Sequence, residues 1–334
     1  GATEVAHVLS TQTLWQRKPR SMRLVFDGVL SAGVTAKDLA LYWIAELGNG
    51  AAAGHAIEYS GSAITSLSMD ARMTLCNLSI EGGARLGMIA PDQVTFDYIQ
   101  AEMDRAKDHG TQNYAPENID SAAEDWKLLY SDVDAVFDRE LHFDAGKVAP
   151  VVSWGISPSQ SIAVTDCIPD PAEQELPAAH ATRSAIDYMG LVPGQSLEGL
   201  PIDQVFLGSC TNGRLEDIRA AATVLKGHRA KVPGLVSPGS SVIKKQAEDE
   251  GLHQVFIEAG LTWAESGCSL CVGMNGDTVA AGKRCASTTN RNFRGRQGQG
   301  SRTHLMSPAM VAAAAVHGRI VDVRSMAVAG ELQP

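Results

Sequence analysis

A chain of 334 residues, with 44% hydrophobic and 20% charged residues, is long enough for two domains with separate cores, which excludes a disordered or fibrous protein. Its formal net charge of -10 gives no overall attraction to nucleic acid or anionic membranes, so an anionic ligand must meet a local basic patch. The longest apolar run, 309–316, is far shorter than the roughly 20 residues that span a bilayer. Six irregularly spaced cysteines favour a reducing compartment, and we therefore expect a cytoplasmic protein without a membrane segment.

Strands and helices are expected to alternate in the first half of the chain. The expected elements are a helix at 2–13, a strand at 22–28, a helix at 35–47, a strand at 55–59, a helix through 67–81 and a buried strand at 148–154. The first helix carries apolar residues at helical spacing and is expected to pack against another element. Thr35 and Asp38 have the spacing of a capping box, which predicts the start of the third element. The acidic segment 97–144 is most simply a solvated surface element.

A proline-rich acidic run at 168–178 has the composition of an exposed connection between domains. It divides the chain into an α/β domain at 1–167 and a second α/β domain at 179–334. The elements expected in the second domain are a helix at 181–189, a strand at 204–207, a helix at 215–225, a strand at 235–236 and helices at 240–250 and 252–259. This alternation predicts a parallel sheet, which binds ligands at the carboxyl ends of its strands.

Three cysteines in glycine-lined turns are candidate metal ligands. Cys210 follows the expected strand at 204–207, and Cys268 and Cys271 form a Cys-x-x-Cys turn that places two sulfurs on one side of a short loop. Three thiolates with one open position suit an iron-sulfur cluster, whereas Cys285 as a fourth ligand could complete a structural zinc site. The spacing favours the cluster only slightly and leaves both possibilities open.

A basic segment lies close behind these cysteines. Between Lys283 and Arg302 there are six cationic side chains and no acidic one, which in an acidic chain predicts an anion-binding loop. A solvated basic loop and a nucleic-acid site are the alternatives, but a single Phe293 offers little surface for stacking bases. His304, beside the cap of an expected helix, is predicted to pack rather than to catalyse. Glu58, in an expected strand, is by itself typical of a solvent-facing residue.

Three motifs together resemble the signature of the aconitase superfamily. They are GSCTNGR at 208–214, GCSLC at 267–271 and NRNFRGR at 290–296. Fuller matches make the chain most similar to the large subunits of bacterial 3-isopropylmalate dehydratases; they lie at 70–77, 87–92, 289–298 and 302–309. The resemblance extends from the first residue to about Val323.

This resemblance implies aconitase-like three-layer α/β/α domains with mostly parallel sheets. Residues 1–167 then correspond to the second domain of the family, with a remnant of the first at the start, and 179–334 correspond to the third. It also implies that Cys210, Cys268 and Cys271 hold a [4Fe-4S] cluster with one iron free to act as a Lewis acid.

The implied activity is that of a hydro-lyase. Loss and readdition of water converts 2-isopropylmalate into 3-isopropylmalate in leucine biosynthesis, and related hydroxy diacids of the homoaconitate, citramalate or citrate type are alternative substrates. The resemblance implies that Asn290, Arg291 and Arg296 bind the substrate. It also implies that Glu58 is a catalytic carboxylate near the substrate hydroxyl.

Two departures from the family pattern bear on activity. Asp-His-Asn and Gly-Asp-Ser-His-Thr segments, which contribute to the active site in the family's large subunits, do not occur, and the usual Trp-Gly-Thr-Asn-Pro-Gly run appears as WGISPS at 154–159. In the family a separate small subunit, with a swivelling domain, supplies the base that removes the carbon-bound proton. We therefore expect a fragment of a heterodimeric enzyme that is inactive alone, with an inactive fragment holding a four-cysteine zinc site as the alternative.

Overall fold

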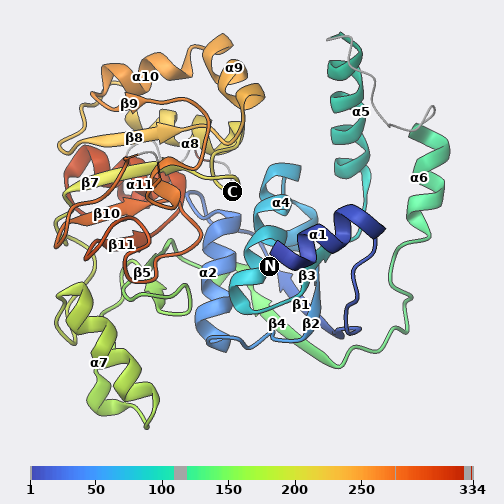
Figure 1. Cartoon of the computed structure of the whole chain (residues 1–334), viewed down its shortest axis with the longest axis horizontal. Helices are drawn as coiled ribbons and strands as arrows, with labels where there is room; N and C mark the ends of the chain where they lie inside the picture. Colours follow the sequence, from blue (N-terminus) through green and yellow to red (C-terminus); the bar gives the residue numbers. More distant parts are fainter. Residues whose placement is uncertain (1, 109–118, 275, 327–331, 333–334) are drawn as a thin grey trace.

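The computed structural model describes residues 2–108, 119–274, 276–326 and 332, and its two larger sheets are both parallel (Figure 1). The first sheet has the order β3-β2-β1-β4. Its strands are β1 (Arg20–Asp27), β2 (His55–Ser60), β3 (Leu86–Ile89) and β4 (Arg139–Asp144). The second sheet has the order β11-β10-β7-β8-β9. Its strands are β7 (Gln204–Gly208), β8 (Gly234–Ser237), β9 (Thr262–Trp263), β10 (Arg284–Ser287) and β11 (Arg302–Leu305). The predicted mostly parallel α/β fold is confirmed.

Alternation of side chains builds the core of the first sheet. Met22, Leu24 and Phe26 of β1 are buried on one face, while Arg23 between them lies on the other. The helices of this part are α1 (Ala2–Thr11), α2 (Ala36–Leu47), α3 (Ser62–Thr65), α4 (Met69–Leu78), α5 (Gln93–Asp108) and α6 (Ile119–Lys127), with short 3-10 turns η1 (Ser79–Gly82) and η2 (Ala145–Lys147). The predicted capping box starts α2, since the Thr35 amide donates to Asp38 Oδ2 at 2.8 Å.

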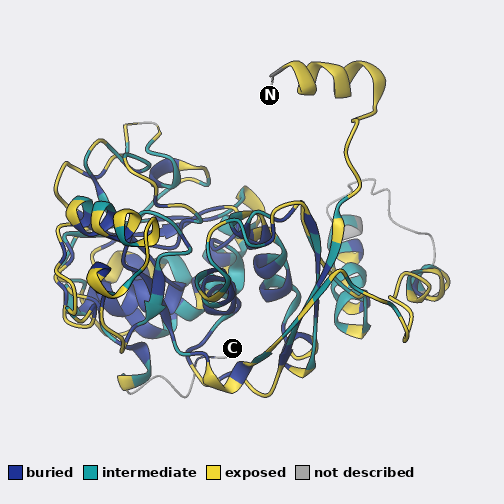
Figure 2. Ribbon diagram, turned by 90° about the horizontal axis from the view of Figure 1, so that it is seen from below, coloured by how far each residue is buried: buried dark blue, intermediate teal, exposed yellow. Residues whose placement is uncertain are grey.

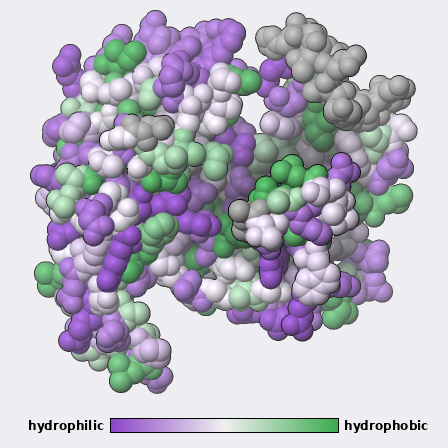
Figure 3. All heavy atoms as spheres, viewed as in Figure 1, coloured by the Kyte–Doolittle hydropathy of each residue, from purple (hydrophilic) through white to green (hydrophobic). Residues whose placement is uncertain are grey.

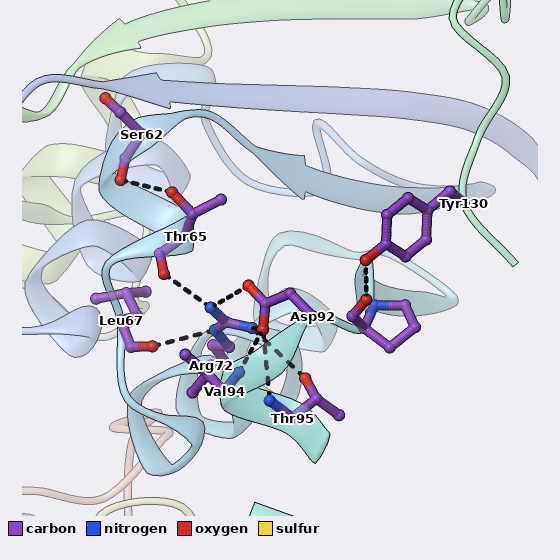
Figure 4. Close-up of polar contacts among 9 residues, drawn as sticks. Ser62, Thr65, Leu67, Arg72, Asp92, Val94, Thr95 and Tyr130 are labelled. Carbon is purple, nitrogen blue, oxygen red and sulfur yellow. Dashed lines mark hydrogen bonds and ion pairs between the residues drawn. The ribbon is translucent and has the colours of Figure 1, made fainter. Parts of the chain in front are cut away.

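A buried arginine fixes the start of α5 (Figure 4). Arg72 of α4 is only 2% exposed, and its guanidinium donates to both carboxylate oxygens of Asp92, at 2.6 and 2.8 Å. The guanidinium also donates hydrogen bonds to the carbonyls of Leu67 and Thr65, so this buried cation has several acceptors around it. Tyr130, after α6, donates to the carbonyl of Pro91, so the chain before α5 and the chain after α6 are held together.

The second sheet is built around a helix that is apolar on all sides. All residues from 308 to 316 in α11 (Pro308–His317) are buried, and this helix packs against α8 and β7. The other elements are an antiparallel hairpin of β5 (Val151–Ser153) and β6 (Ser161–Ala163), helices α7 (Ala178–Met189), α8 (Leu215–Leu225), α9 (Ser241–Asp249) and α10 (Leu252–Glu258), and 3-10 turns η3 (Pro171–Glu173), η4 (Ser269–Cys271) and η5 (Val323–Ser325).

The two cores meet earlier in the sequence than expected. Val148 belongs to the core of the first sheet, whereas Val152, Trp154 and Ile168 belong to the core of the second. We call residues 20–148 the first unit and residues 151–326 the second unit. Ile168, the first residue of the predicted linker at 168–178, is buried in the second core, and the hairpin before it contacts both β11 of the second sheet and α2 of the first unit. The domain boundary at this linker stays a prediction.

The expectation that residues 2–13 pack against another element is wrong. Val5, Val8 and Leu9 of α1 are exposed, and Figure 2 shows the helix standing away from the rest of the chain. On the face drawn in Figure 3, hydrophobic side chains gather over this helix. None of the described helices is long and apolar enough to cross a membrane.

His304 is a buried packing residue of β11. Its Nδ1 donates to the carbonyl of Ser153 at 2.8 Å, and its Nε2 faces the guanidinium of Arg284 at 3.2 Å. Arg284 can only donate, so Nε2 must accept and the ring must be neutral. Burial, reinforced by Arg284, lowers the pKa of His304 to about 3.

This neutral histidine predicts a loss of stability in mild acid. The unfolded chain gains a proton at His304 below its usual pKa of about 6.5, whereas the folded chain does not, so the free energy of unfolding falls as pH decreases. Between pH 7 and pH 5.5 this one group is expected to remove about 1 kcal/mol. Urea unfolding of the wild type and His304→Gln measures the contribution, and equal pH dependence in both chains would contradict it.

Candidate active site

The Cys210 loop lies at the carboxyl end of β7, where a parallel sheet binds its ligands. Gly208 ends the strand, and a Cβ there would lie 2.6 Å from the carbonyl oxygen of Ser237, so only glycine fits. Ser209 follows with a φ of 116°, a conformation that is rare for a residue with a side chain. The turn leaves Cys210 exposed while Thr211 is buried. The thiol is therefore presented outward from a fixed loop.

Cys268 and Cys271 lie in the turn around η4. The Cys271 amide donates to the Cys268 carbonyl at 2.7 Å, and Ser269 between them has a φ of 41°. The hydroxyl of Ser269 donates to Asp277 at 2.7 Å, and this hydrogen bond connects the turn to the chain that follows it. Cys268 is exposed and Cys271 is half-buried, so this turn presents two thiols as the sequence predicts.

The thiols of Cys210 and Cys268 both influence the ionisation of Cys271. Burial is the largest cause that raises the pKa of Cys271; Arg296 opposes the rise, and the thiols of Cys210 and Cys268 add to it. Among the described residues, no group of three Cys, His, Asp or Glu side chains is close enough together to hold a single metal ion. A [4Fe-4S] cluster differs from a single ion, because each thiolate binds a separate iron and the sulfurs are farther apart. The three thiols suit that donor set.

Cys285, the fourth cysteine of the zinc alternative, lies in an apolar cluster of the second sheet. Its side chain is 0% exposed on β10, within an apolar cluster that includes Phe206, Leu270 and Val279. Its sulfur contacts the carbonyl of the next residue at 3.6 Å, and burial raises the pKa of this thiol well above its usual range. A buried thiol of this kind is typical of a packing residue. Among the residues that the structure describes, no Cys, His, Asp and Glu side chains form a group that could hold a single metal ion, so the four-cysteine zinc site stays an alternative prediction.

Two of the predicted substrate residues lie against the cysteine loops. Asn290 donates from Nδ2 to the Thr211 hydroxyl at 2.8 Å, beside Cys210. Its Oδ1 is buried and has no hydrogen-bond partner among the described residues, which is unusual and leaves an acceptor for a bound group. Arg296 donates from Nε to the carbonyl of Cys271 at 2.8 Å, and its guanidinium lies 5.3 Å from the ring centre of Phe293.

Arg291 pairs with a carboxylate of the first unit that sequence reasoning passed over. Its Nε lies 2.9 Å from both oxygens of Glu81 in η1. The Arg291 side chain is 47% exposed and that of Glu81 is 8% exposed, so a nearly buried carboxylate orients a cation that still reaches solvent. The two residues are 210 positions apart, and only the fold brings them together.

Glu58 is hydrogen-bonded to residues of its own unit. Glu58 lies on β2, on the face opposite to the core, and accepts hydrogen bonds from Arg23 at 3.2 Å and from Ser131. Both partners belong to the first unit. Of the two predicted arginines, Arg291 pairs with Glu81, while Arg296 donates to the Cys271 carbonyl. The catalytic role of Glu58 stays a prediction.

Further contacts from the first unit fix the Cys210 loop and α8. The hydroxyl of Thr74 donates to the Thr211 carbonyl at 3.2 Å, and the hydroxyl of Ser68 donates to Glu216 at 2.5 Å. Asp217 accepts from the Arg214 amide at 3.0 Å and from Asn212 at 3.3 Å, while burial raises the pKa of its carboxyl to about 7. The site is thus assembled from both units.

A parallel α/β sheet presents three thiols and an arginine-rich loop after its strands β7, β9 and β10. The family comparison agrees: the description "Aconitase family (aconitate hydratase)" belongs to a family model that matches residues 1–318. The chain belongs to the aconitase family, whose named activity is that of a hydro-lyase.

Two solved structures show weaker likenesses. Aconitase X from Thermococcus kodakaraensis, in its holo-form, is 10% identical with a TM-score of 0.38, over 82% of this chain and 50% of that chain. A glycosyltransferase from Rickettsia africae ESF-5 is 10% identical with a TM-score of 0.20, over 82% of this chain and 74% of that chain. The chain spans half the length of the aconitase X structure.

Proposed function

We propose that this chain is the large subunit, or part of the large subunit, of a 3-isopropylmalate dehydratase. The observation that carries the proposal is the convergence of the Cys210 loop, the Cys268–Cys271 turn and the Arg291 loop at one edge of the second sheet. The family supports a hydro-lyase, and the motifs at 289–298 and 302–309 favour isopropylmalate over related hydroxy diacids.

Cys210, Cys268 and Cys271 would hold a [4Fe-4S] cluster, which when bound supplies a Lewis-acidic iron that weakens the carbon–oxygen bond of the substrate. Arg291 and Arg296 are the cations placed to bind the substrate carboxylates, since a guanidinium pairs with a carboxylate in bidentate geometry. Asn290 offers its free Oδ1 to a hydroxyl hydrogen. Glu81, held beside Arg291, is the carboxylate placed to accept a proton at Oε1 or Oε2.

The proposal includes a partner. A small subunit would supply the base for the carbon-bound proton and close the site over the substrate, so this chain alone is expected to be inactive. Residues that select the substrate side chain would lie largely on that partner, which leaves citrate-like, homocitrate-like and methylated malates as the other candidates.

An anaerobic assay of the chain, reconstituted with iron and sulfide and mixed with the small subunit from the same operon, tests this function. We expect 2-isopropylmalate to be converted into the alkene diacid, whose ultraviolet absorbance measures the rate. The other hydroxy diacids should be turned over more slowly. Turnover of a different diacid alone would identify another dehydratase of the family. Absence of turnover with all of them, in a chain that carries the cluster, would contradict a hydro-lyase.

A further inference from the structure

Lys37 is a buried lysine at the boundary between the two units. It lies in the first turn of α2, which packs against β5 and β6 of the second unit (Figure 1), and it is 1% exposed. Lysine is almost never fully buried unless its charge is paired or hydrogen-bonded. The position of this side chain therefore requires an explanation from its partners.

The Nζ atom of Lys37 donates to three oxygens of the second unit. They are Asn212 Oδ1 at 3.0 Å, the Thr288 carbonyl at 2.6 Å and the Thr289 carbonyl at 3.0 Å. All three atoms can only accept, and an ammonium group has three hydrogens to give, whereas a neutral amine has two and a lone pair that would face an oxygen. The geometry therefore fits the charged form.

Electrostatics agree with this geometry. Burial lowers the pKa of Lys37 to about 8, while Asp217, Asp38, Cys271 and Glu81 act in the opposite direction. The lysine is mostly charged at neutral pH, and its positive charge interacts with the carboxylate of Glu81 and with the thiol of Cys271.

Lys37 connects the two loops that carry the predicted ligands and substrate residues. Asn212 is two residues after Cys210, and Thr289 directly precedes Asn290. The Thr288 hydroxyl also exchanges hydrogen bonds with both the amide and the carbonyl of Gly208, at 2.8 and 2.7 Å. One ammonium group therefore fastens both loops to α2.

We propose that Lys37 is a positioning residue that holds the Cys210 loop and the Arg291 loop in register with each other and with the first unit. The inference rests on the proposed function, since it concerns the loop that carries a proposed cluster ligand. The role is structural and electrostatic: without the ammonium group, the Asn212 oxygen and two carbonyls lose their charged donor in a buried place.

Hydrogen exchange of the full chain without iron tests this role. In Lys37→Met the amides of 208–214 are expected to exchange at least about ten-fold faster, because charged hydrogen bonds that hold the loop are lost. A peptide from α11 (Pro308–His317) should exchange as in the wild type. Lys245→Met is the matched control, since this lysine pairs with Asp249 on the exposed surface of α9 and should leave 208–214 unchanged.

Cys285 reports whether the variant still folds, because its buried thiol resists alkylation only in the folded chain. If Cys285 becomes reactive in Lys37→Met, the milder variant Lys37→Gln is used in its place, because glutamine keeps two hydrogen-bond donors without the charge. The same exchange measurement on 208–214 then tests the role of Lys37. Wild-type exchange at 208–214 in a folded Lys37 variant would overturn the proposal.

The iron content after anaerobic reconstitution separates this inference from the proposed function. Reduced iron retention in the Lys37 variant, with faster loop exchange, supports both. A wild-type chain that binds no iron contradicts the proposed function, while the exchange result still decides the role of Lys37.

Discussion

Replacing Cys268 by serine is expected to abolish iron binding and, in the complex with the small subunit, hydro-lyase activity. The cysteine is exposed, and a change of sulfur to oxygen at an exposed position alters stability by only about 0.5 kcal/mol. The chain should therefore remain folded. A lost visible charge-transfer band would then reflect a lost ligand, since a thiolate and not a hydroxyl suits an iron-sulfur cluster.

Cys167→Ser is the control for this prediction. Cys167 is also a free exposed cysteine, but it lies before η3, at a backbone bridge to Ser196 and outside the cysteine loops. It should retain iron and activity. Full iron content in Cys268→Ser would show that this cysteine is not a ligand.

Replacing Arg291 by glutamine is expected to lower kcat/KM by about two orders of magnitude. A hydrogen-bonded charge pair is worth about 1.5–3 kcal/mol, and loss of a substrate carboxylate contact should appear mainly as a higher KM. The change also leaves Glu81 without its cation, so part of the loss should appear in kcat. Steady-state kinetics of the reconstituted complex with 2-isopropylmalate measure both.

Arg294→Gln controls for the loss of a positive charge from the same basic segment. Arg294 donates to the carbonyl and hydroxyl of Ser184 on α7, at 2.9 and 2.6 Å, and not to the site. Its kinetics should change little. Equal losses in the two variants would mean that the segment acts only through its total charge.

The sequence predicts most of the second sheet because each element has a local signal. The strand at 204–207 and the helix at 215–225 coincide closely with β7 and α8, since apolar periodicity and flanking glycines fix both. The cysteine turns are visible for the same reason. Their spacing and glycines are local properties of the chain.

The carboxylate of the site could not be found in this way. Glu58 and Glu81 both lie beside apolar residues, and local pattern does not distinguish them; the choice depends on which one the fold brings to Arg291. Lys37 was equally hidden, because lysine is normally exposed and its three acceptors lie 175 to 252 residues away. Contacts between the two units depend on packing and have no local signal in the sequence. The helix α1 shows the opposite situation: its apolar residues have helical spacing, but in the described chain they stay exposed.

The most direct test of a three-cysteine cluster is metal and sulfide analysis of the wild-type chain after anaerobic reconstitution. Three thiolate ligands predict about four irons and four sulfides per chain, a broad visible charge-transfer band and an EPR signal on reduction. One zinc per chain with no iron and no visible band would contradict the account.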